Sequence, residues 1–164
     1  MTGTSPARLR SRPPARFDLA RFVQAQDGCY DQALAELRAG RKRSHWIWYV
    51  LPQLQALGRS AMAREYGIQG LDEAVAYLAH PVLGPRLLEC VQALLTHSGN
   101  ASATEILGEV DAMKLRSCLT LFHAAAPAVP CFADALRAFY QGLPDPETLR
   151  LLVPLSGGAG PPPD

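Results

Sequence analysis

The chain has 164 residues, which is enough for one domain. Hydrophobic residues make up 48% of it and charged residues 19%, a composition typical of a globular protein with a sizeable core. The net charge of +1 hides an asymmetry, because residues 1–16 hold four of the 16 basic residues and no acid, which leaves the rest with 12 basic against 15 acidic residues. Since folded nucleic-acid-binding domains carry a basic surplus, this balance disfavours nucleic acid as a partner of the folded part.

The two ends of the chain differ in composition from the rest. Residues 1–16, MTGTSPARLRSRPPAR, are rich in Pro, Ser and Arg and lack the apolar core of a secretory signal, so we predict a disordered arm there. Residues 154–164 are predicted to form a flexible tail, which leaves one helical domain over residues 17–153. No stretch approaches the roughly 18 apolar residues of a membrane span, so no membrane partner is expected.

The cysteines do not form a metal or disulfide pattern. They are scattered among apolar neighbours, without a CxxC or a Cys–His pair at ligand spacing: Cys29, Cys90, Cys118 and Cys131. We therefore expect no metal and no cofactor. Free thiols in a chain without a signal sequence are typical of the reducing cytoplasm, which is the predicted location.

Apolar residues recur at helical spacing along most of the chain. The segment at 71–80 is an example, with Leu71, Ala74, Val75 and Leu78 on one face. Helices are predicted over 17–26, 30–40, 71–80, 84–97, 102–108, 111–126, 131–142 and 145–152. The one candidate strand is the wholly apolar WIWYV at 46–50. The sequence predicts an all-α, compact and irregular multi-helix single domain.

The least generic stretch is RKRSHWIWYVLPQL at 41–54, which holds both tryptophans of the chain. Trp46 and Trp48 cannot face one direction in either a helix or a strand. One is expected in the core, and the other is free to stack on a planar group. The alternative is that both tryptophans fill the core and that one of them forms a hydrogen bond there through its indole N–H.

Polar groups accompany these rings. His45, Tyr49 and Gln53 share a face with Trp48 at helical spacing, although Pro52 ends such a helix, and rings beside donors and acceptors are typical of small-molecule pockets. His45 is a candidate general acid or base, with a structural hydrogen-bonding role as the alternative. Lys42 is a candidate for binding a phosphate.

A second polar line runs along the helix predicted over 111–126. Asp111, Lys114, Ser117 and Thr120 follow each other at intervals of three and lie on one side of that helix. Two interpretations stay open: a solvated face with Asp111 as the N-cap, or a phosphate site with Lys114 and Arg116 as cations and the two hydroxyls as donors.

The remaining candidates are isolated. Arg86 follows the stiff corner at 80–85 and is a candidate for holding an anion at a helix N-terminus, or a plain surface residue. The motifs GxSxG, GxxxxGK, GxGxxG and HExxH are absent from the sequence. Glu36 and Asp111 are the carboxylates nearest to the candidate site, and with His45 they form the catalytic set.

Long stretches of the chain resemble one family, the mostly uncharacterised bacterial and fungal proteins of domain of unknown function 1810. The resemblance runs from Phe17 to about Leu152 and rests on RFVQAQ, YDQALAELRAGRKRSHWIWYVLPQL, LGRSAMAREYGI, LDEAVAYLAHPVLGPRLLEC and DAMKLRSCLTLF. It implies a compact helical domain and no established activity. Some members are labelled calpastatin, but that inhibitor is a disordered polar chain, unlike this one.

The helical layout is also similar to that of NADAR domains, which act on ADP-ribose derivatives and related N-glycosides; no catalytic residue is carried over from them. Two functional hypotheses follow. The first is a pocket for a nucleotide-like ligand, with metal-independent hydrolysis of an N-glycosidic bond as the best-fitting reaction. The second is a non-catalytic protein-interaction module. The oligomeric state cannot be read from the sequence.

Overall fold

The computed structural model describes residues 17–157, with side chains over 17–153, and between these limits it contains ten α-helices, one 3₁₀-helix and no β-strand. The elements are α2 (Ala20–Asp27), α3 (Tyr30–Ala39), α4 (Ile47–Val50), η2 (Gln55–Leu57), α5 (Ala61–Glu65), α6 (Leu71–Ala79), α7 (Leu83–Leu95), α8 (Ala103–Leu107), α9 (Glu109–Ala125), α10 (Pro130–Tyr140) and α11 (Pro146–Gly157). The all-α prediction is confirmed, and no helix in this part of the chain is long and apolar enough to cross a membrane.

Each of the eight predicted helices is present, and two short ones were missed. The prediction of a strand at WIWYV is wrong. The carbonyl of Trp46 accepts from the N–H groups of Tyr49 and Val50, and these bonds begin the single helical turn of α4. The last helix continues to Gly157, five residues beyond its predicted end at 152. The predicted disordered arm at 1–16 and the remainder of the C-terminal tail lie outside the described residues.

Helix ends follow local sequence signals at two places and depart from them at one. Gly40 ends α3 in the left-handed conformation with a φ of 77°. Ser102 and Glu105 form the capping box of α8, with hydrogen bonds of 3.0 and 2.8 Å. Asp111, however, is not an N-cap, because α9 begins at Glu109 directly after Gly108 and places Asp111 inside its first turn.

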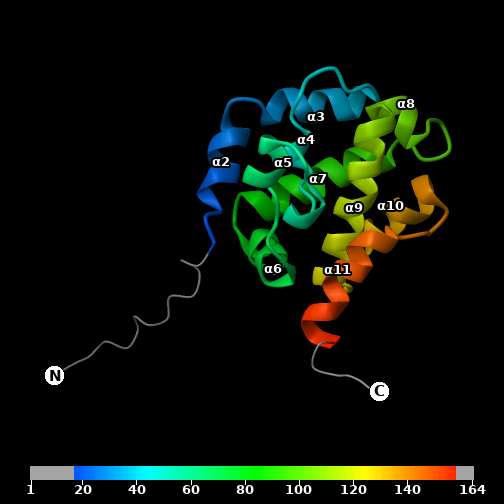
Figure 1. The fold of residues 1–164 in the computed structure, drawn as a ribbon. Helices are drawn as coiled ribbons and strands as arrows, with labels where there is room; N and C mark the ends of the chain where they lie inside the picture. The colour runs from blue at the N-terminus through cyan, green and yellow to red at the C-terminus, as the bar shows by residue number, and fades with distance from the viewer. Residues whose placement is uncertain (1–16, 158–164) are drawn as a thin grey trace.

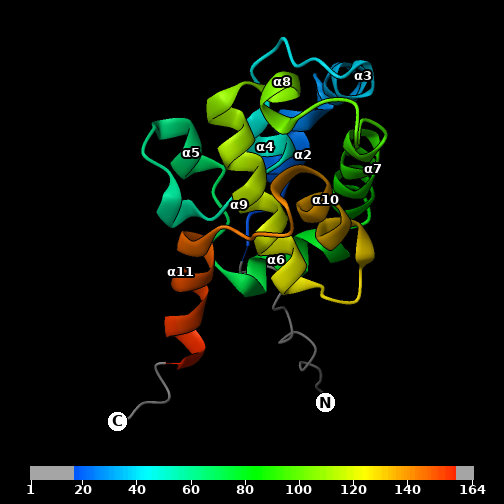
Figure 2. The same cartoon turned by 90° about the vertical axis from the view of Figure 1, so that its right-hand side faces the viewer.

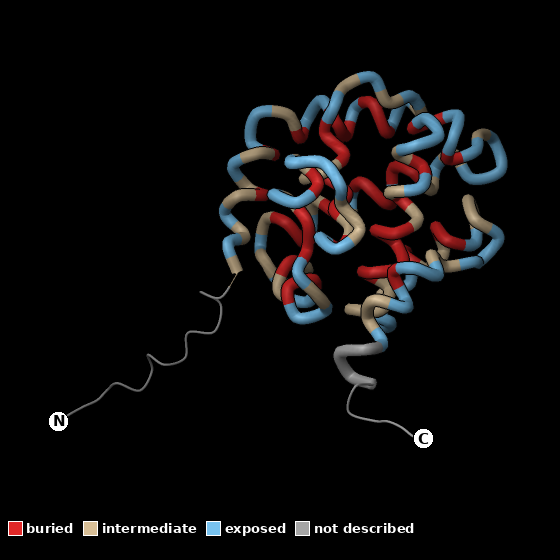
Figure 3. The backbone as a smooth tube through the Cα atoms, in the orientation of Figure 1, coloured by how far each residue is buried: buried red, intermediate tan, exposed pale blue. Residues whose placement is uncertain are grey.

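The core is built around α9, which packs against α6, α8, α10 and α11. A chain of aromatic rings crosses it, with centroid distances of 5.1 Å from Phe22 to Tyr77, 5.3 Å from Tyr77 to Phe122 and 6.0 Å from Phe122 to Phe132. These rings join α2, α6, α9 and α10 at separations that favour aromatic pairs. Buried segments accordingly gather inside a shell of exposed turns (Figure 3).

Both views of the fold place α9 between α10 and the segment that contains α5 (Figure 1, Figure 2). This α5 segment, residues 53–68, is a compact excursion closed at its base. The N–H of Gln55 donates to Ile68 O at 2.8 Å, and the N–H of Ile68 donates to Gln53 O at 2.9 Å. Its two ends approach so closely that a Cβ at Gly67 would lie 2.3 Å from the Cα of Gln55.

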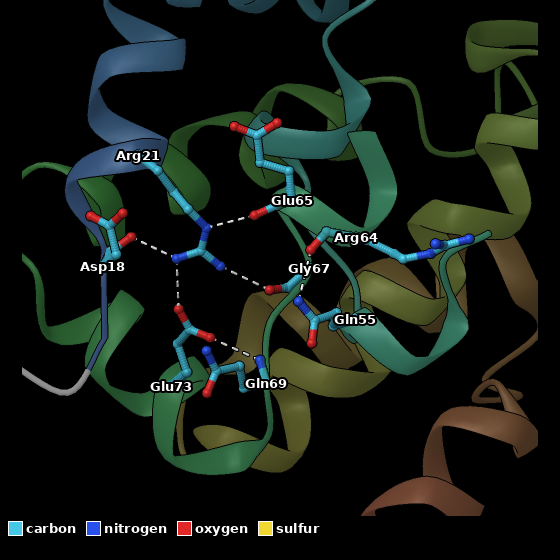
Figure 4. A network of polar contacts seen from close by, with 8 residues as sticks. All are labelled: Asp18, Arg21, Gln55, Arg64, Glu65, Gly67, Gln69 and Glu73. Carbon is cyan, nitrogen blue, oxygen red and sulfur yellow. Dashed lines mark hydrogen bonds and ion pairs between the residues drawn. The ribbon is translucent and has the colours of Figure 1, made fainter. Parts of the chain in front are cut away.

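A half-buried arginine ties the α5 segment to the rest of the fold (Figure 4). From α2, Arg21 donates to the carbonyls of Glu65 at 2.7 Å and Gly67 at 2.9 Å, and to the carboxylate of Glu73 at 3.1 Å. Glu73, on α6, is fully buried and also accepts from the N–H of Gln69 at 2.8 Å. This clamp fixes the position of the α5 segment against α2 and α6.

We predict that Arg21→Ala lowers the free energy of unfolding by about 3–5 kcal/mol, because it leaves the buried carboxylate of Glu73 without a charged partner. Arg38→Ala is the matched control, since Arg38 pairs with Glu89 while both side chains are largely exposed, and such pairs contribute roughly 1 kcal/mol or less. Urea unfolding measures both. Equal losses in the two variants would contradict the clamp.

Candidate functional site

Residues 41–46, here called the basic loop, are folded around one carboxylate. Glu36, on α3, is 8% exposed and accepts five hydrogen bonds. The donors are the N–H of Arg43 at 2.9 Å, the N–H and hydroxyl of Ser44 at 3.1 and 2.6 Å, the indole of Trp46 at 2.8 Å and the amide of Gln32 at 3.1 Å. None of the five donor groups is a cation, so Glu36 acts here as the anchor of the loop.

The same contacts set the ionisation of Glu36. Burial alone would raise its pKa, but the hydrogen bonds from Ser44, the N–H of Arg43 and Trp46 outweigh burial and lower the pKa to about 2. Because the five donors occupy both carboxylate oxygens, the geometry leaves no free position for a substrate proton, and Glu36 lies outside the cavity described below. Its predicted catalytic role has no support from this placement.

The two tryptophans have different environments. Trp46 is 1% exposed and takes the core position, with its indole N–H bonded to Glu36. Trp48 is half-buried, and the ammonium of Lys114 lies 5.4 Å from its ring centroid. Tyr49 is also half-buried and packs edge-on against Tyr66 at 5.1 Å, and its burial raises its pKa to about 12. No described residue stacks face to face on Trp48.

Two lysines converge on Asp111. The Nζ atom of Lys42 lies 2.8 Å from Oδ2 of Asp111, its side chain is only 7% exposed, and it sits 5.0 Å from the ring centroid of Trp46. Lys114, one turn after Asp111 on α9, places its Nζ atom 4.0 Å from Oδ1. The single carboxylate is therefore taken by Lys42, and the ammonium of Lys114 makes no hydrogen bond to any of the described residues.

A cavity of about 520 Å³ opens beside Lys114, between the α5 segment, α9 and the start of α11. This volume lies within the range of small-molecule sites. Its walls are Gln53, Leu57, Gly58, Arg59, Ser60 and Ala63 from the α5 segment, Val110, Met113, Lys114, Arg116 and Ser117 from α9, and Asp145 and Glu147 from the last helix and its cap. In Figure 2, α5 lies on one side of α9, and α11 starts beneath them. We call this space the α5–α9 cavity.

The charges around the α5–α9 cavity are unevenly engaged. Arg116 donates to the carbonyls of Leu143 and Pro144 at 2.9 and 3.0 Å, which holds the connection to α11. The side chain of Arg59 has no hydrogen bond or ion pair with the described residues, so Arg59 and Lys114 are the cations that a ligand could use. The apolar side chains of Leu57, Val110 and Met113 supply the remaining surface.

Asp145 caps α11 and forms part of the opposite wall. Its Oδ2 atom accepts from the N–H and hydroxyl of Thr148 at 2.9 and 2.6 Å and from Ser117 at 3.3 Å. Its N–H donates to the hydroxyl of Thr120 at 2.8 Å. Within the described residues Oδ1 accepts no hydrogen bond, so Asp145, a residue of this wall, has one carboxylate oxygen without a donor.

The predicted site residues therefore separate into three groups. Gln53, Lys114 and Ser117 line the α5–α9 cavity, while Lys42, Trp48 and Asp111 lie behind Lys114 and fix it. A third group neither lines the cavity nor pairs with Asp111 or Lys114: Glu36, His45, Trp46, Tyr49, Arg86 and Thr120. His45 is exposed and does not line the α5–α9 cavity, and Arg86 pairs with Asp27 and covers the ring of Tyr30 on the α2–α7 side. Thr120 is buried, and its hydroxyl donates to the carbonyl of Arg116.

Sequence reasoning missed Arg59, Asp145 and Glu147. The sequence contains a signal for Asp145, because Asp-Pro-Glu-Thr is a typical helix start and the hydroxyl groups of Ser117 and Thr120 require hydrogen-bond partners. Nothing in the sequence indicated that the α5 segment would face α9. Among the described residues no group of three or more His, Cys, Asp or Glu side chains is arranged to hold a metal ion.

The lowered pKa of Glu36 predicts a pH dependence of stability. The unfolded carboxyl has a pKa near 4.5, so the stabilisation is present above that pH and is lost as the pH falls from 4.5 toward 2. The shift corresponds to about 3 kcal/mol. Denaturant unfolding between pH 5 and pH 2 should therefore show a steeper decline for the wild type than for Glu36→Gln, which is itself less stable at pH 5. Parallel declines would contradict this role of Glu36.

Comparison with known proteins assigns the chain to a family. A search of curated proteins finds no significant match. The crystal structure of a conserved hypothetical protein from Mycobacterium tuberculosis, Rv1873, is similar, with 48% sequence identity and a TM-score of 0.81 over 84% of this chain and 98% of that one. The sequence profile described as "Protein of unknown function (DUF1810)" matches residues 16–152, nearly the whole described part, and the chain belongs to this family.

Proposed function

We propose that the protein binds a small, nucleotide-like anion in the α5–α9 cavity and that Lys114 makes the principal contact with its charge. The observation that carries this proposal is the ammonium of Lys114, which borders the cavity, lies 4.0 Å from the nearest carboxylate oxygen and has no hydrogen bond to the described residues. Removing an ammonium from water, even in part, costs free energy unless another group replaces the hydrogen bonds of the water. An anionic ligand would supply that group.

The surroundings of Lys114 support an anion with an attached flat or sugar-like body. Arg59 adds a second cation on the facing wall, and Leu57, Val110 and Met113 offer apolar surface for a ring. Asp145 provides an acceptor for a hydroxyl group at the other side, whereas both carboxylate oxygens of Glu147 accept from Arg150. Trp48 borders only a niche of about 10 Å³ next to the cavity, the space of roughly one water molecule, so its role in this proposal is to hold Lys114.

The reaction that best fits such a ligand is metal-independent hydrolysis of an N-glycosidic bond. Asp145 lines the cavity and has one carboxylate oxygen that accepts no hydrogen bond from the described residues, so we assign to it the activation of a water or the stabilisation of an oxocarbenium-like centre. Asp111, the acid expected from the sequence, is engaged by Lys42 and acts on the ligand through Lys114.

Binding is tested by calorimetry with ADP-ribose, NAD, nucleosides and sugar phosphates. Lys114→Gln should weaken the tightest ligand at least tenfold, and wild-type affinity should fall with added salt, since an ammonium–anion contact is screened. Arg137→Gln on α10 is the control, because it removes the same charge from an exposed pair with Asp134. Equal affinities in the two variants would contradict the proposal, and no binding by any compound at millimolar concentration would favour an interaction module.

Hydrolysis is tested separately with Asp145→Asn. Asparagine is as good an N-cap as aspartate, so α11 should stay in place while the carboxylate is lost. We expect turnover of an N-glycoside ligand to fall by about 10²-fold or more with little change in its affinity. Unchanged turnover would remove Asp145 from the mechanism, and the absence of turnover in the wild type would reduce the function to binding.

A further inference from the structure

A second basic feature lies on the side of the molecule formed by α3 and is not used by the proposed function. A groove of about 510 Å³ runs between α3 and the basic loop, and its lining residues are Gln32, Ala35, Glu36, Ala39, Arg41 and Arg43. It shares no residue with the α5–α9 cavity. We call it the arginine groove. Figure 1 shows the loop after α3 arching over this end of the fold.

The two arginines of the groove are exposed, and neither guanidinium has a hydrogen bond or an ion pair with the described residues. The other polar groups of the groove are already engaged. Glu36 accepts five hydrogen bonds, and the amide of Gln32 donates to Glu36 at 3.1 Å and to Ser44 at 2.8 Å. The groove thus combines a satisfied polar base, a small apolar floor at Ala35 and Ala39, and two unpaired cations.

The backbone that carries these arginines is fixed on both sides. The N–H of Arg41 donates to Glu36 O at 3.0 Å, and that of Arg43 donates to the Glu36 carboxylate at 2.9 Å. Between them, Lys42 is turned inward by the bond of its N–H to Ile106 O at 2.8 Å and by its ion pair with Asp111. With Lys42 directed inward, the residues on either side of it both border the groove, and their fixed backbone reduces the conformational entropy that is lost when the two side chains bind a ligand.

We infer that the arginine groove binds a phosphoryl group of a small molecule, held by Arg41 and Arg43 together. Each guanidinium presents five N–H donors in a planar fork that matches phosphate oxygens in pairs, and two forks match the charge and the several acceptors of a phosphoryl group better than the two oxygens of a carboxylate. The remaining volume accommodates the rest of such a ligand over the alanine floor. A long nucleic acid is disfavoured because the chain beyond residue 16 has an excess of acidic residues.

The test is a titration of the full-length ¹⁵N-labelled protein with inorganic pyrophosphate at constant ionic strength, followed through the amide shifts of residues 32–44. Saturable shifts in this segment are expected. Arg41→Gln/Arg43→Gln should raise the dissociation constant at least tenfold. The control Arg38→Gln/Arg137→Gln, which removes the same charge from exposed pairs with Glu89 and Asp134, should stay within twofold of the wild type.

Two more titrations distinguish the arginine groove from the α5–α9 cavity and from unspecific attraction of anions. Lys114→Gln should leave the pyrophosphate-induced shifts of residues 32–44 unchanged. The titration therefore tests the arginine groove independently of the α5–α9 cavity. Citrate at equal ionic strength should bind at least fivefold more weakly than pyrophosphate. Equal binding by the two arginine double variants, equal binding of citrate, or saturation by a single-stranded oligonucleotide without any by pyrophosphate would each overturn the inference.

Discussion

The geometry of the candidate site depends on the buried carboxylate of Glu36. A carboxylate removed from water without a cation is stable only when its oxygens receive several hydrogen bonds, and here two backbone N–H groups, a hydroxyl, an amide and an indole supply them. Satisfying this one group obliges the basic loop to fold back over α3. It also carries Trp46 into the core, because the indole N–H is one of the five donors.

The fold of the basic loop then divides its cations among separate tasks. Lys42 points inward and takes the carboxylate of Asp111, so that Lys114, one helical turn away, is left with a distant partner at 4.0 Å beside the α5–α9 cavity. Arg41 and Arg43 remain outside. The facing wall of the cavity is held independently, since Arg21 and Glu73 fix the α5 segment to α2 and α6. Two buried carboxylates, Glu36 and Glu73, thus set the two sides of the proposed ligand site.

Local signals in the sequence were sufficient for the longer helices and several of their ends. Gly40 ends a helix and the Ser102–Glu105 pair begins one, as the sequence predicts. The single turn at 47–50 could not be predicted, because a short apolar run is compatible with both a helix and a strand. Lys114, Ser117 and Gln53 were recognised as candidates because polar residues at helical spacing share a face. The role of Glu36 could not be predicted, since it depends on which distant donors the tertiary fold brings to it. For Asp145 the sequence indicates the helix cap but not its place on the wall of the α5–α9 cavity.

With Glu36 anchoring the basic loop and Lys42 taking the carboxylate of Asp111, the ammonium of Lys114 has no hydrogen bond to the described residues beside the α5–α9 cavity. The proposed small-molecule site rests on that ammonium. The most direct measurement is an ¹⁵N–¹H correlation spectrum of the wild-type protein recorded with increasing ADP-ribose up to millimolar concentration. We expect saturable shifts that cluster on the amides of the cavity walls, at Gly58, Ala63, Lys114 and Ser117. Shifts absent from these walls while they appear elsewhere, or no shifts at all, would contradict the proposed site.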